Sequence, residues 1–590
     1  MADDLIPGFL FMHDTLTATL PVATDASTPV APGAPAAPVT VRTPMARTSA
    51  LAAPALMLAG CGSGSDTASP PTPPPAPVGP SAAQASRFLA QASMGADRTR
   101  IERVKALGYA GWLDEQFAMA PSMSRCDWLV SKGYDQPGTN NAFKNGFAGF
   151  DSCAWKKLIA SPDTLRQRVT LALSELLVSS LLGYAGGWRA FAGARYLDLL
   201  EANAFGNYRA LLQEVSTSAP MGEYLTFRGN LKANPATGAL PDENYARELL
   251  QLFSIGLVQL NPDGTPRLVS GAPVETYGLA DVTGLARIFT GWEWDLSVGS
   301  GNTPDFQRRP MVQNANRHET GASTFLGTTV PAGSDGAAHL RAALDIVFAH
   351  PNVAPFVSRQ LIQKLVTSNP SPAYVQRVAS VFLDDGAGVR GNLKAVVRAL
   401  LLDSEARSVP APGAVGQGKL REPMLRFLGW ARAYGLQSPG DLWAVGDTSD
   451  AATRLGQSPL RSPSVFNFFR PGYVPPNSGI AAAALVAPEF QLTNESSVVG
   501  YLNFMQQVIG AGIGDMKPDY ASLLPLADDA NALLAEINLV MAADQVSAAT
   551  LAPLVAAVAS MPSGTATARN NRIGAALTLV MAAPEYQVLK

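Results

Sequence analysis

The sequence is poor in cysteine, in charge of either sign and in long apolar runs. Its 590 residues contain 3 cysteines and no C-x-x-C, which excludes ribbon-type zinc sites, dithiol redox centres and c-type haem attachment. The 44 basic and 47 acidic residues give a formal charge of -3, so the basic excess typical of nucleic-acid-binding proteins is missing. No run of 18 or more apolar residues occurs, and no segment of the mature chain is expected to span a bilayer.

Hydrophobic residues, by contrast, make up 47% of the chain, enough to form a large core. The length allows two or three domains or one unusually large one. These numbers describe a globular protein and leave its activity open.

Residues 45–60 resemble a bacterial lipoprotein signal peptide. Arg47 lies in a short basic segment, an apolar run covers residues 50–59, and the letters LAGC ending at Cys61 match a lipobox. The resemblance implies cleavage before Cys61 and three acyl chains on that residue. At roughly 0.8 kcal/mol per buried methylene, three chains anchor a protein durably. The alternative is a buried cysteine in an Ala-rich helix.

The segments on either side of this signal are expected to lack a packed core. Residues 1–44 are rich in Pro, Ala and Thr, and we interpret them as a mis-assigned start or a non-structural leader. Residues 61–80 join the lipidated cysteine to a Gly/Ser/Pro tether. By analogy with lipoprotein sorting, Gly62 indicates the outer membrane. The sequence therefore predicts an exported, lipid-anchored protein of the outer membrane or periplasm.

The two remaining cysteines agree with export. In an oxidising compartment Cys126 and Cys153 would close a loop of about 28 residues, a disulfide that stabilises by roughly 3.5 kcal/mol. The alternative is a pair of small buried thiols.

From residue 81 onward the apolar positions recur with helical period, and strands are scarce. The pattern predicts a mainly α fold: a large multi-helical globular domain over 81–590 with one small β-hairpin. The hairpin is expected at 258–269, around the turn Asn261-Pro262-Asp263-Gly264. Helices are predicted at about 83–107, 161–183, 191–218, 336–349, 354–367, 372–383, 391–404, 418–434, 496–510, 529–541, 547–560 and 568–582.

A charged stretch, PDENYARELLQLFSIGLVQLN at 241–261, begins another predicted helix. Asp242 is the expected N-cap, and Glu243 with Arg247 forms an i,i+4 pair. Helical spacing places Glu248 on a polar arc opposite the apolar residues, which on spacing alone is a solvated face. Gly256 is expected to end the helix.

Several motifs together are similar to one bacterial family. They are residues 86–117, NYARELLQLFSIGLVQLNPDGT, DVTGLARIFTGW, HETGASTFLG, KLREP and SPSVFNFFRPGY, in that order. On these motifs the chain resembles the domain-of-unknown-function 1800 family over most of 81–590. The resemblance implies a large, mostly helical, often exported protein without an established activity.

The resemblance also implies a partner. Genes of this family often lie beside those of the domain-of-unknown-function 1501 family, whose members look like secreted phosphatases or sulfatases. Such a protein is the expected partner, together with the membrane through the lipid anchor. No cofactor is indicated.

An enzymatic hypothesis gathers polar residues of these motifs in one cleft. Glu248, His318 and Glu319 would supply general acid and base, while arginines would bind an anionic group. The alternative is structural, with Arg-Glu pairs joining helices and His318 satisfied in a loop. The residues expected to contact substrate are Asn244, Arg247, Arg287, Trp292, Phe468 and Arg470.

A metal site is not predicted. Glu248, His318 and Glu319 are the nearest approach to a ligand set, but adjacent His and Glu rarely chelate one ion together, and no H-E-x-x-H motif occurs. His339 is expected to be exposed.

The aromatic residues around Arg470 and in TGWEWD leave two interpretations open. They line a saccharide or peptide groove, or they pack in the core. The leading prediction is therefore a lipid-anchored cell-envelope binding or assembly factor, in which Phe468 and Tyr473 line an apolar groove. The alternative is a hydrolase of envelope or extracellular polymers that uses Glu248 and His318.

Overall fold

A computed structural model describes residues 79–333, 335–410 and 416–590. The predicted leader, signal peptide and lipidation site Cys61 lie outside these ranges, as does the tether up to residue 78. Helices dominate the described residues, and the strands form two-stranded sheets, which confirms the mainly α prediction. Among the described helices none combines the length and the apolar character needed to cross a membrane.

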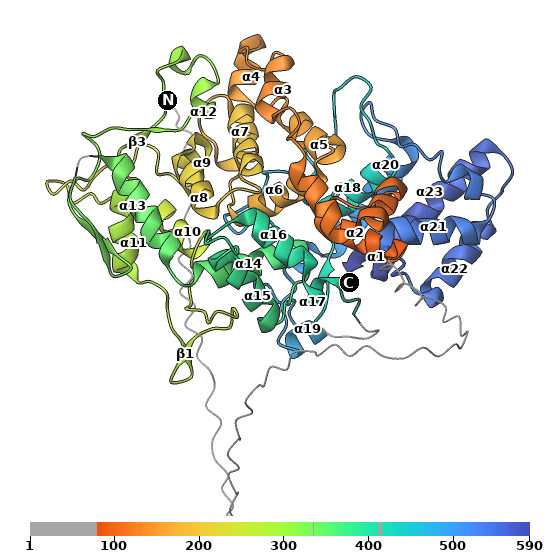
Figure 1. The fold of residues 1–590 in the computed structure, drawn as a ribbon. Coiled ribbons are helices and arrows are strands. Elements are labelled where there is room, and N and C mark those ends of the chain that lie inside the picture. Colours follow the sequence, from red (N-terminus) through yellow and green to blue (C-terminus); the bar gives the residue numbers. More distant parts are fainter. Residues whose placement is uncertain (1–78, 334, 411–415) are drawn as a thin grey trace, which may run out of the picture. The chain divides into compact units, whose positions relative to one another are not determined.

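The regular elements of the N-terminal part of the described chain, up to residue 224, are all helices (Figure 1). Its helices, including the short 3-10 turns η1 and η2, are α1 (Ala82–Ala92), α2 (Arg98–Ala118), α3 (Arg125–Ser131), η1 (Thr139–Asn141), α4 (Ala142–Asn145), α5 (Phe150–Ala160), α6 (Thr164–Leu176), η2 (Leu181–Gly183), α7 (Arg189–Ala202), α8 (Tyr208–Thr217) and α9 (Ala219–Tyr224).

The middle part mixes helices with short antiparallel strand pairs. Strands pair as β1 with β2, β3 with β4, and β5 with β6. The elements are α10 (Asn244–Gln251), β1 (Leu268–Val269), β2 (Ala272–Pro273), α11 (Leu279–Ala286), η3 (Arg287–Phe289), β3 (Trp292–Glu293), η4 (Gly299–Gly301), α12 (Asp305–Arg308), β4 (Val312–Gln313), β5 (Ser323–Phe325), β6 (Thr328–Val330), α13 (Gly336–Ala349), α14 (Val353–Leu365), α15 (Pro372–Leu383), α16 (Leu393–Leu402) and α17 (Ser404–Arg407).

The C-terminal part returns to the first helices. Helix α1 packs against α21, so the two ends of the described chain lie side by side (Figure 1). The elements are β7 (Lys419–Leu420), α18 (Pro423–Ala433), α19 (Gly479–Ala482), η5 (Pro488–Leu492), α20 (Glu495–Ala511), η6 (Leu524–Leu526), α21 (Ala530–Ala542), α22 (Ala548–Ala559), α23 (Ala566–Ala582), α24 (Pro584–Gln587) and β8 (Val588–Leu589), with β8 paired to β7.

Most predicted helices are present, and several differ for local reasons. The stretch 83–107 is divided into α1 and α2, because Asp97 caps α2 by accepting the Arg100 N–H. The stretch 191–218 is split into α7 and α8, because Asn207 caps a new helix by accepting a hydrogen bond from the Arg209 N–H. Helix α6 begins at Thr164, later than predicted, because Gln116 of α2 accepts the hydrogen bond of the Leu165 N–H. It ends at Leu176 instead of near residue 183.

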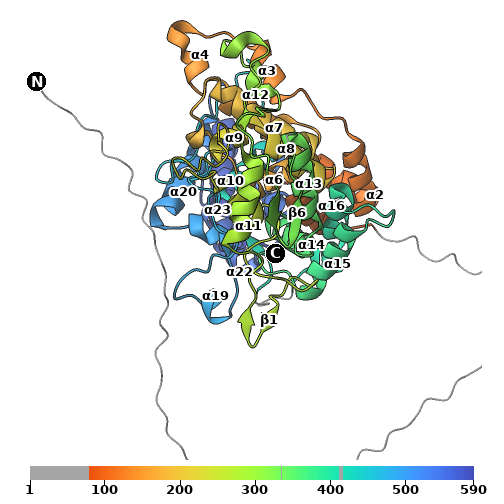
Figure 2. The same ribbon diagram turned by 90° about the vertical axis from the view of Figure 1, so that its left-hand side faces the viewer.

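The predicted hairpin exists and extends further than expected. Its turn closes with the Gly264 N–H donating to the Asn261 carbonyl, and Gly264 has a φ of 77°. The chain then turns again at Ser270 and Gly271 to pair β1 with β2. This β1 hairpin and α19 project at the same end, opposite α3, α4 and α12 (Figure 2).

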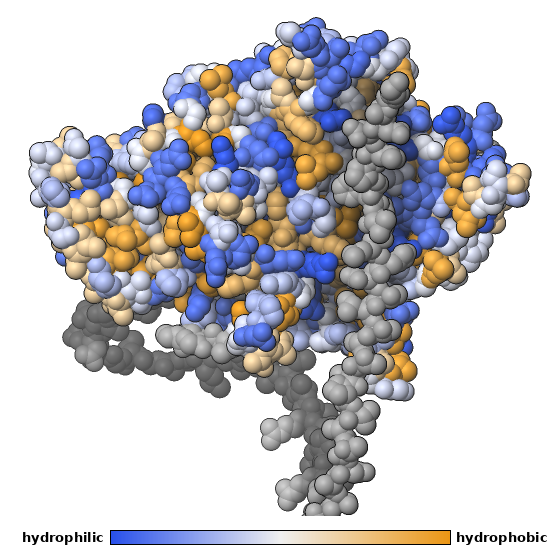
Figure 3. Space-filling view, turned by 180° about the vertical axis from the view of Figure 1, so that it is seen from behind, coloured by the Kyte–Doolittle hydropathy of each residue, from blue (hydrophilic) through white to orange (hydrophobic). Residues whose placement is uncertain are grey.

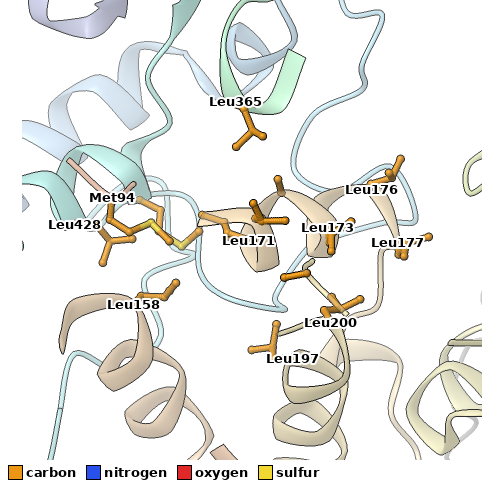
Figure 4. Close-up of a cluster of buried hydrophobic side chains, with 14 of the residues drawn as sticks. Met94, Leu158, Leu171, Leu173, Leu176, Leu177, Leu197, Leu200, Leu365 and Leu428 are labelled. Carbon is orange, nitrogen blue, oxygen red and sulfur yellow. The ribbon is translucent and has the colours of Figure 1, made fainter. Parts of the chain in front are cut away.

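Helix α6 runs through the core. Its leucines pack against Leu365 of α14 on one side and against leucines of α5 and α7 on the other (Figure 4). Burying a leucine fully contributes roughly 1.5–3 kcal/mol, so this contact fixes α6 relative to its neighbours. Two charged residues of the same helix, Arg168 and Glu175, are consequently buried as well.

The surface carries apolar side chains among hydrophilic ones. On the face opposite that of Figure 1, apolar side chains form several separate patches between hydrophilic areas (Figure 3). Scattered apolar residues are ordinary on a protein surface, so a binding role needs a concave site.

Candidate functional site

The first turn of α10 is tied to its neighbours. The helix starts at Asn244, and Asp242 is not its N-cap but accepts the Asn244 N–H in a turn that precedes the helix. The predicted Glu243–Arg247 pair is present, with 3.1 Å between Arg247 Nη2 and Glu243 Oε2. Thr283 Oγ1 of α11 donates to Glu243 Oε1 at 2.6 Å. These polar groups therefore join α10 to α11.

Glu248 does not lie on a solvated face. Its side chain is buried, with 9% of the residue exposed, and Oε2 has no hydrogen-bond partner among the described residues. Burial raises the pKa of Glu248, while Arg247 opposes this effect. Burial and the Glu248 charge together raise the pKa of Tyr224 to about 12. Burial and Glu248 likewise raise the pKa of Tyr277, against the effect of Arg247.

Both ring nitrogens of His318 are used inside the protein. The residue is 0% exposed, Nδ1 lies 3.0 Å from the Thr290 carbonyl oxygen, and Nε2 lies 2.8 Å from His339 Nδ1. Because a carbonyl only accepts, Nδ1 carries the proton and Nε2 accepts from His339. Burial, and then His339, lower the pKa of His318, although the Thr290 carbonyl opposes this. The ring is a satisfied interior histidine.

The prediction that His339 is exposed is wrong. His339 lies in the first turn of α13 and is 6% exposed. The sequence around His339 is polar and rich in small residues, so it does not indicate burial. The residue is buried because α13 packs on the loop that contains His318.

Glu319 forms an ion pair with Arg287. Arg287 Nη2 lies 3.3 Å from Glu319 Oε1, which also accepts the Gly321 N–H at 3.1 Å. Burial would raise the pKa of Glu319, but the Gly321 N–H and Arg287 hold it below its ordinary value. The pair holds the loop after His318 against η3.

The proposed catalytic residues belong to neighbouring family motifs, but within the described chain Glu248 is not bonded to the others. Among the described residues no hydrogen bond or ion pair joins Glu248 to His318, Glu319 or Arg287. Within the same ranges, no group of three or more His, Cys, Asp and Glu side chains is arranged to hold a metal ion. The catalytic roles of Glu248, His318 and Glu319 stay predictions.

The remaining predicted contacts lie elsewhere. Trp292 is buried in β3, and its indole N–H donates to the Ile288 carbonyl. Arg470 is exposed, with its guanidinium carbon 4.8 Å from the Phe466 ring centroid, and its backbone N–H donates to Gln491. Phe468 is partly exposed. The residues expected to contact one substrate thus lie on different segments.

The structure does not contain the predicted Cys126–Cys153 disulfide. Both residues are free, buried thiols, which matches the alternative of two small core residues. The Cys153 thiol donates to the Phe150 carbonyl of its own helix at 3.1 Å and is directed along α5. Burial raises the pKa of both thiols, so neither is a reactive thiolate.

Buried charged side chains that spacing did not single out form a network in the core. They come from α6, α14, the β7–α18 segment and η5, and they are Arg168, Glu175, Lys364, Lys419, Glu422 and Glu489.

The lysine and glutamate side chains of this network lie close together. Lys364 Nζ lies 3.2 Å from Glu175 Oε2, and Lys419 Nζ lies 3.0 Å from Glu489 Oε1. Burial and the neighbouring Glu422 raise the pKa of Glu175 to about 8. Burial would raise the pKa of Glu422, but Lys419 and Glu175 hold it at about 2. Glu175 is therefore protonated and Glu422 ionised at neutral pH.

An apolar groove lies on the outer side of the β7–β8 pair. Its volume is about 320 Å³, and its walls come from β7, α18, η5, α20 and α24. Arg426 is the charged residue among those lining it; its guanidinium stacks 4.0 Å from the Tyr501 ring centroid, and its Nε has no partner among the described residues. Phe468 and Tyr473 do not line this groove, but the Tyr473 carbonyl accepts the N–H of Ala487, just before η5.

The comparison with protein families agrees with the motifs. The model of the family described as protein of unknown function, DUF1800, matches residues 87–588. The chain belongs to the DUF1800 family. No curated protein and no solved structure matches it.

In this DUF1800 chain, one motif that carries the resemblance forms β7 and part of the groove wall, and a second ends close to η5. KLREP supplies Lys419, Arg421 and Glu422, and SPSVFNFFRPGY runs up to Tyr473, beside η5. A signal for the buried network was therefore present: charged residues in a family motif and within the apolar repeat of α6. Spacing alone did not place them together, because they lie up to about 320 residues apart in the sequence.

Proposed function

We propose that this protein is an exported, lipid-anchored binding or assembly factor of the bacterial cell envelope, and that the groove outside β7–β8 is its binding site. The observation that carries the proposal is the groove itself, a concave, mainly apolar site of about 320 Å³ with one charged residue, Arg426, in its wall. Ligand and peptide sites in proteins have this size and composition. The lipobox at Cys61 supports the location.

The proposed occupant is an apolar segment of an exported protein partner that carries a carboxylate. A volume of about 320 Å³ accommodates roughly three large apolar side chains. Arg426 is the one charged residue in the groove wall, and its positive charge favours an occupant that carries a carboxylate. The secreted phosphatase- or sulfatase-like protein that the family resemblance implies is the proposed partner.

The rival function, a hydrolase of envelope polymers, is favoured by one observation. Glu248 is a buried carboxyl with a raised pKa and an unpartnered oxygen, which are features of general acids. Its proposed companion His318 has both nitrogens occupied. The apolar groove therefore supports a binding role better than Glu248 and His318 support hydrolysis.

Two neighbouring valines provide a matched test of the binding site. Val498 and Val499 of α20 are 44% and 57% exposed, and of the two only Val498 lines the groove. In Val498→Asp, a new carboxylate faces the apolar walls, and we expect partner recovery to fall roughly tenfold or more. Val499→Asp places the same charge outside the groove and should leave recovery unchanged.

The experiment captures the tethered full chain from the envelope and quantifies the phosphatase- or sulfatase-like protein. A photo-reactive residue at position 498 should crosslink to it, and one at 499 should not. Equal recovery with both aspartate variants contradicts the proposal. Recovery of bound glycan without a protein partner supports the hydrolase.

The lipid anchor has its own test. Mass spectrometry of the envelope-bound protein should find an N-terminal peptide that begins at a triacylated Cys61. Cys61→Ser should release the protein from the membrane fraction. An unmodified Met1 on a freely soluble product would remove the basis for the envelope role.

A further inference from the structure

A small cavity lies on the inner side of β7–β8, opposite the groove. Because successive strand residues face opposite sides, Leu420 and Val588 face the groove, while their neighbours Lys419 and Leu589 line the cavity. The cavity has a volume of about 40 Å³. It is closed where Gly95 meets α18, since a Cβ on Gly95 would lie 2.7 Å from the Cα of Gly429.

The charged residues lining the cavity are all cationic. They are Arg168 of α6, Lys419 of β7 and Arg421, which follows β7. No acidic side chain is among the described residues that line it. The field inside the cavity therefore favours negative charge.

Both arginines have hydrogen-bond donors that the protein does not use. Arg168 is 1% exposed; its Nη2 donates to the Lys364 carbonyl at 2.6 Å, whereas its Nε and Nη1 have no partner among the described residues. Arg421 donates from Nη1 to the Met541 carbonyl at 2.9 Å, and within the same ranges its Nε and Nη2 have no partner. Leaving charged N–H groups unpaired in the interior is costly, so a group outside the chain is needed to accept from them.

The carboxylates of the neighbouring network do not meet this need. Glu489 and Glu422 both lie within ion-pair distance of Lys419, and Glu175, which is protonated, lies beside Lys364. Arg421 has no ion pair among the described residues, and the Tyr586 ring is its neighbour, with the guanidinium carbon 5.0 Å from the ring centroid. The cation of Arg421 is therefore left without a counterion from the described chain.

We propose that this cavity binds one small inorganic anion, a halide or a tetrahedral oxyanion, held by the unused donors of Arg168 and Arg421. A cavity of about 40 Å³ holds roughly three water molecules, which excludes an extended organic ligand. The bound anion bridges α6 to the β7–α18 segment, and its binding energy adds to the stability of the fold. Since β7 also forms part of the groove wall, an anion bound on its cavity side stabilises the position of that wall.

The direct test is anomalous diffraction from crystals of the full chain grown with sodium bromide. We expect a bromide peak within hydrogen-bond distance of the Arg168 and Arg421 guanidinium groups. Water at this position, with no bromide peak, overturns the proposal for a halide. Parallel crystals with sodium sulfate or sodium phosphate distinguish an oxyanion, and absence of density for all three ions overturns the proposal altogether.

A solution test uses thermal unfolding at constant ionic strength. When sodium gluconate is replaced by sodium bromide, sulfate or phosphate, the melting temperature should rise with the logarithm of the binding anion's concentration. Arg421→Met should abolish this rise. Arg432→Met, which removes a buried guanidinium bonded to the carbonyls of Leu158, Ile159 and Ser161 away from the cavity, should keep it. An equal rise in Arg421→Met overturns the proposal, and if that variant does not fold, the diffraction result decides.

Discussion

The polar residues around α10 and those around β7 differ in how completely they are satisfied. Around α10, Arg247 and Thr283 both donate to Glu243 and both nitrogens of His318 are used, with Glu248 Oε2 as the exception. Around β7, charged groups are more deeply buried, yet Arg168 and Arg421 keep unused donors. The polar residues of α10, which resemble a reactive site in the sequence, thus mainly join α10 to α11. The unused hydrogen-bond donors belong instead to Arg168, within the apolar pattern of α6, and to Arg421 beside β7.

The largest expected effect comes from breaking the network around β7. Lys419→Met removes the partner of Glu489 and leaves buried carboxylates uncompensated, which costs about 3–5 kcal/mol of unfolding free energy. Lys105→Met removes an exposed pair with Glu102 and should cost less than about 1 kcal/mol. Denaturant unfolding measures both, and equal losses would contradict the burial argument.

A pH dependence follows from Glu175. Its pKa is about 8 in the folded protein and about 4.3 when unfolded, so the folded state binds the extra proton between these values. Stability is therefore lost as the pH rises through this window. Glu175→Gln keeps the neutral form and should match the wild-type melting temperature at pH 5 but exceed it at pH 8. The control Glu102→Gln, at an exposed position, should leave the wild-type slope in place; the same slope in Glu175→Gln would refute the assignment.

A smaller effect is expected around α10. Glu248→Gln removes a buried carboxylate without a partner for Oε2, and the unfolding free energy at pH 7 should stay the same or rise by up to about 1 kcal/mol. Thermal unfolding at pH 7 measures this change. A large loss of stability would show that the carboxylate has a structural partner.

The smallest change concerns the cysteines. Because Cys126 and Cys153 are free and buried, alkylation without reductant should leave both unmodified in the native protein and modify both after unfolding. Intact-mass measurement counts the added groups. If neither cysteine is alkylated after unfolding, the result would support a Cys126–Cys153 disulfide instead.

The sequence predicted what local periodicity determines. The helices α13 to α16, the turn at Asn261 to Gly264 and the Glu243–Arg247 pair follow from apolar spacing, turn chemistry and i,i+4 geometry. The burial of Glu248 and His339, and the meeting of Arg168 with Lys419, depend on contacts between distant segments. Such contacts leave no mark on local spacing, so the sequence predicts neither the burial of Glu248 nor the charged network beside β7.

Capture of the proposed partner by Glu248→Gln and Val498→Asp, side by side from the envelope, tests the central claim most directly. If the protein works by binding through the groove beside β7, Glu248→Gln recovers the phosphatase- or sulfatase-like protein at the wild-type level and Val498→Asp loses it. Loss with Glu248→Gln and full recovery with Val498→Asp would place the function at α10 and contradict the account.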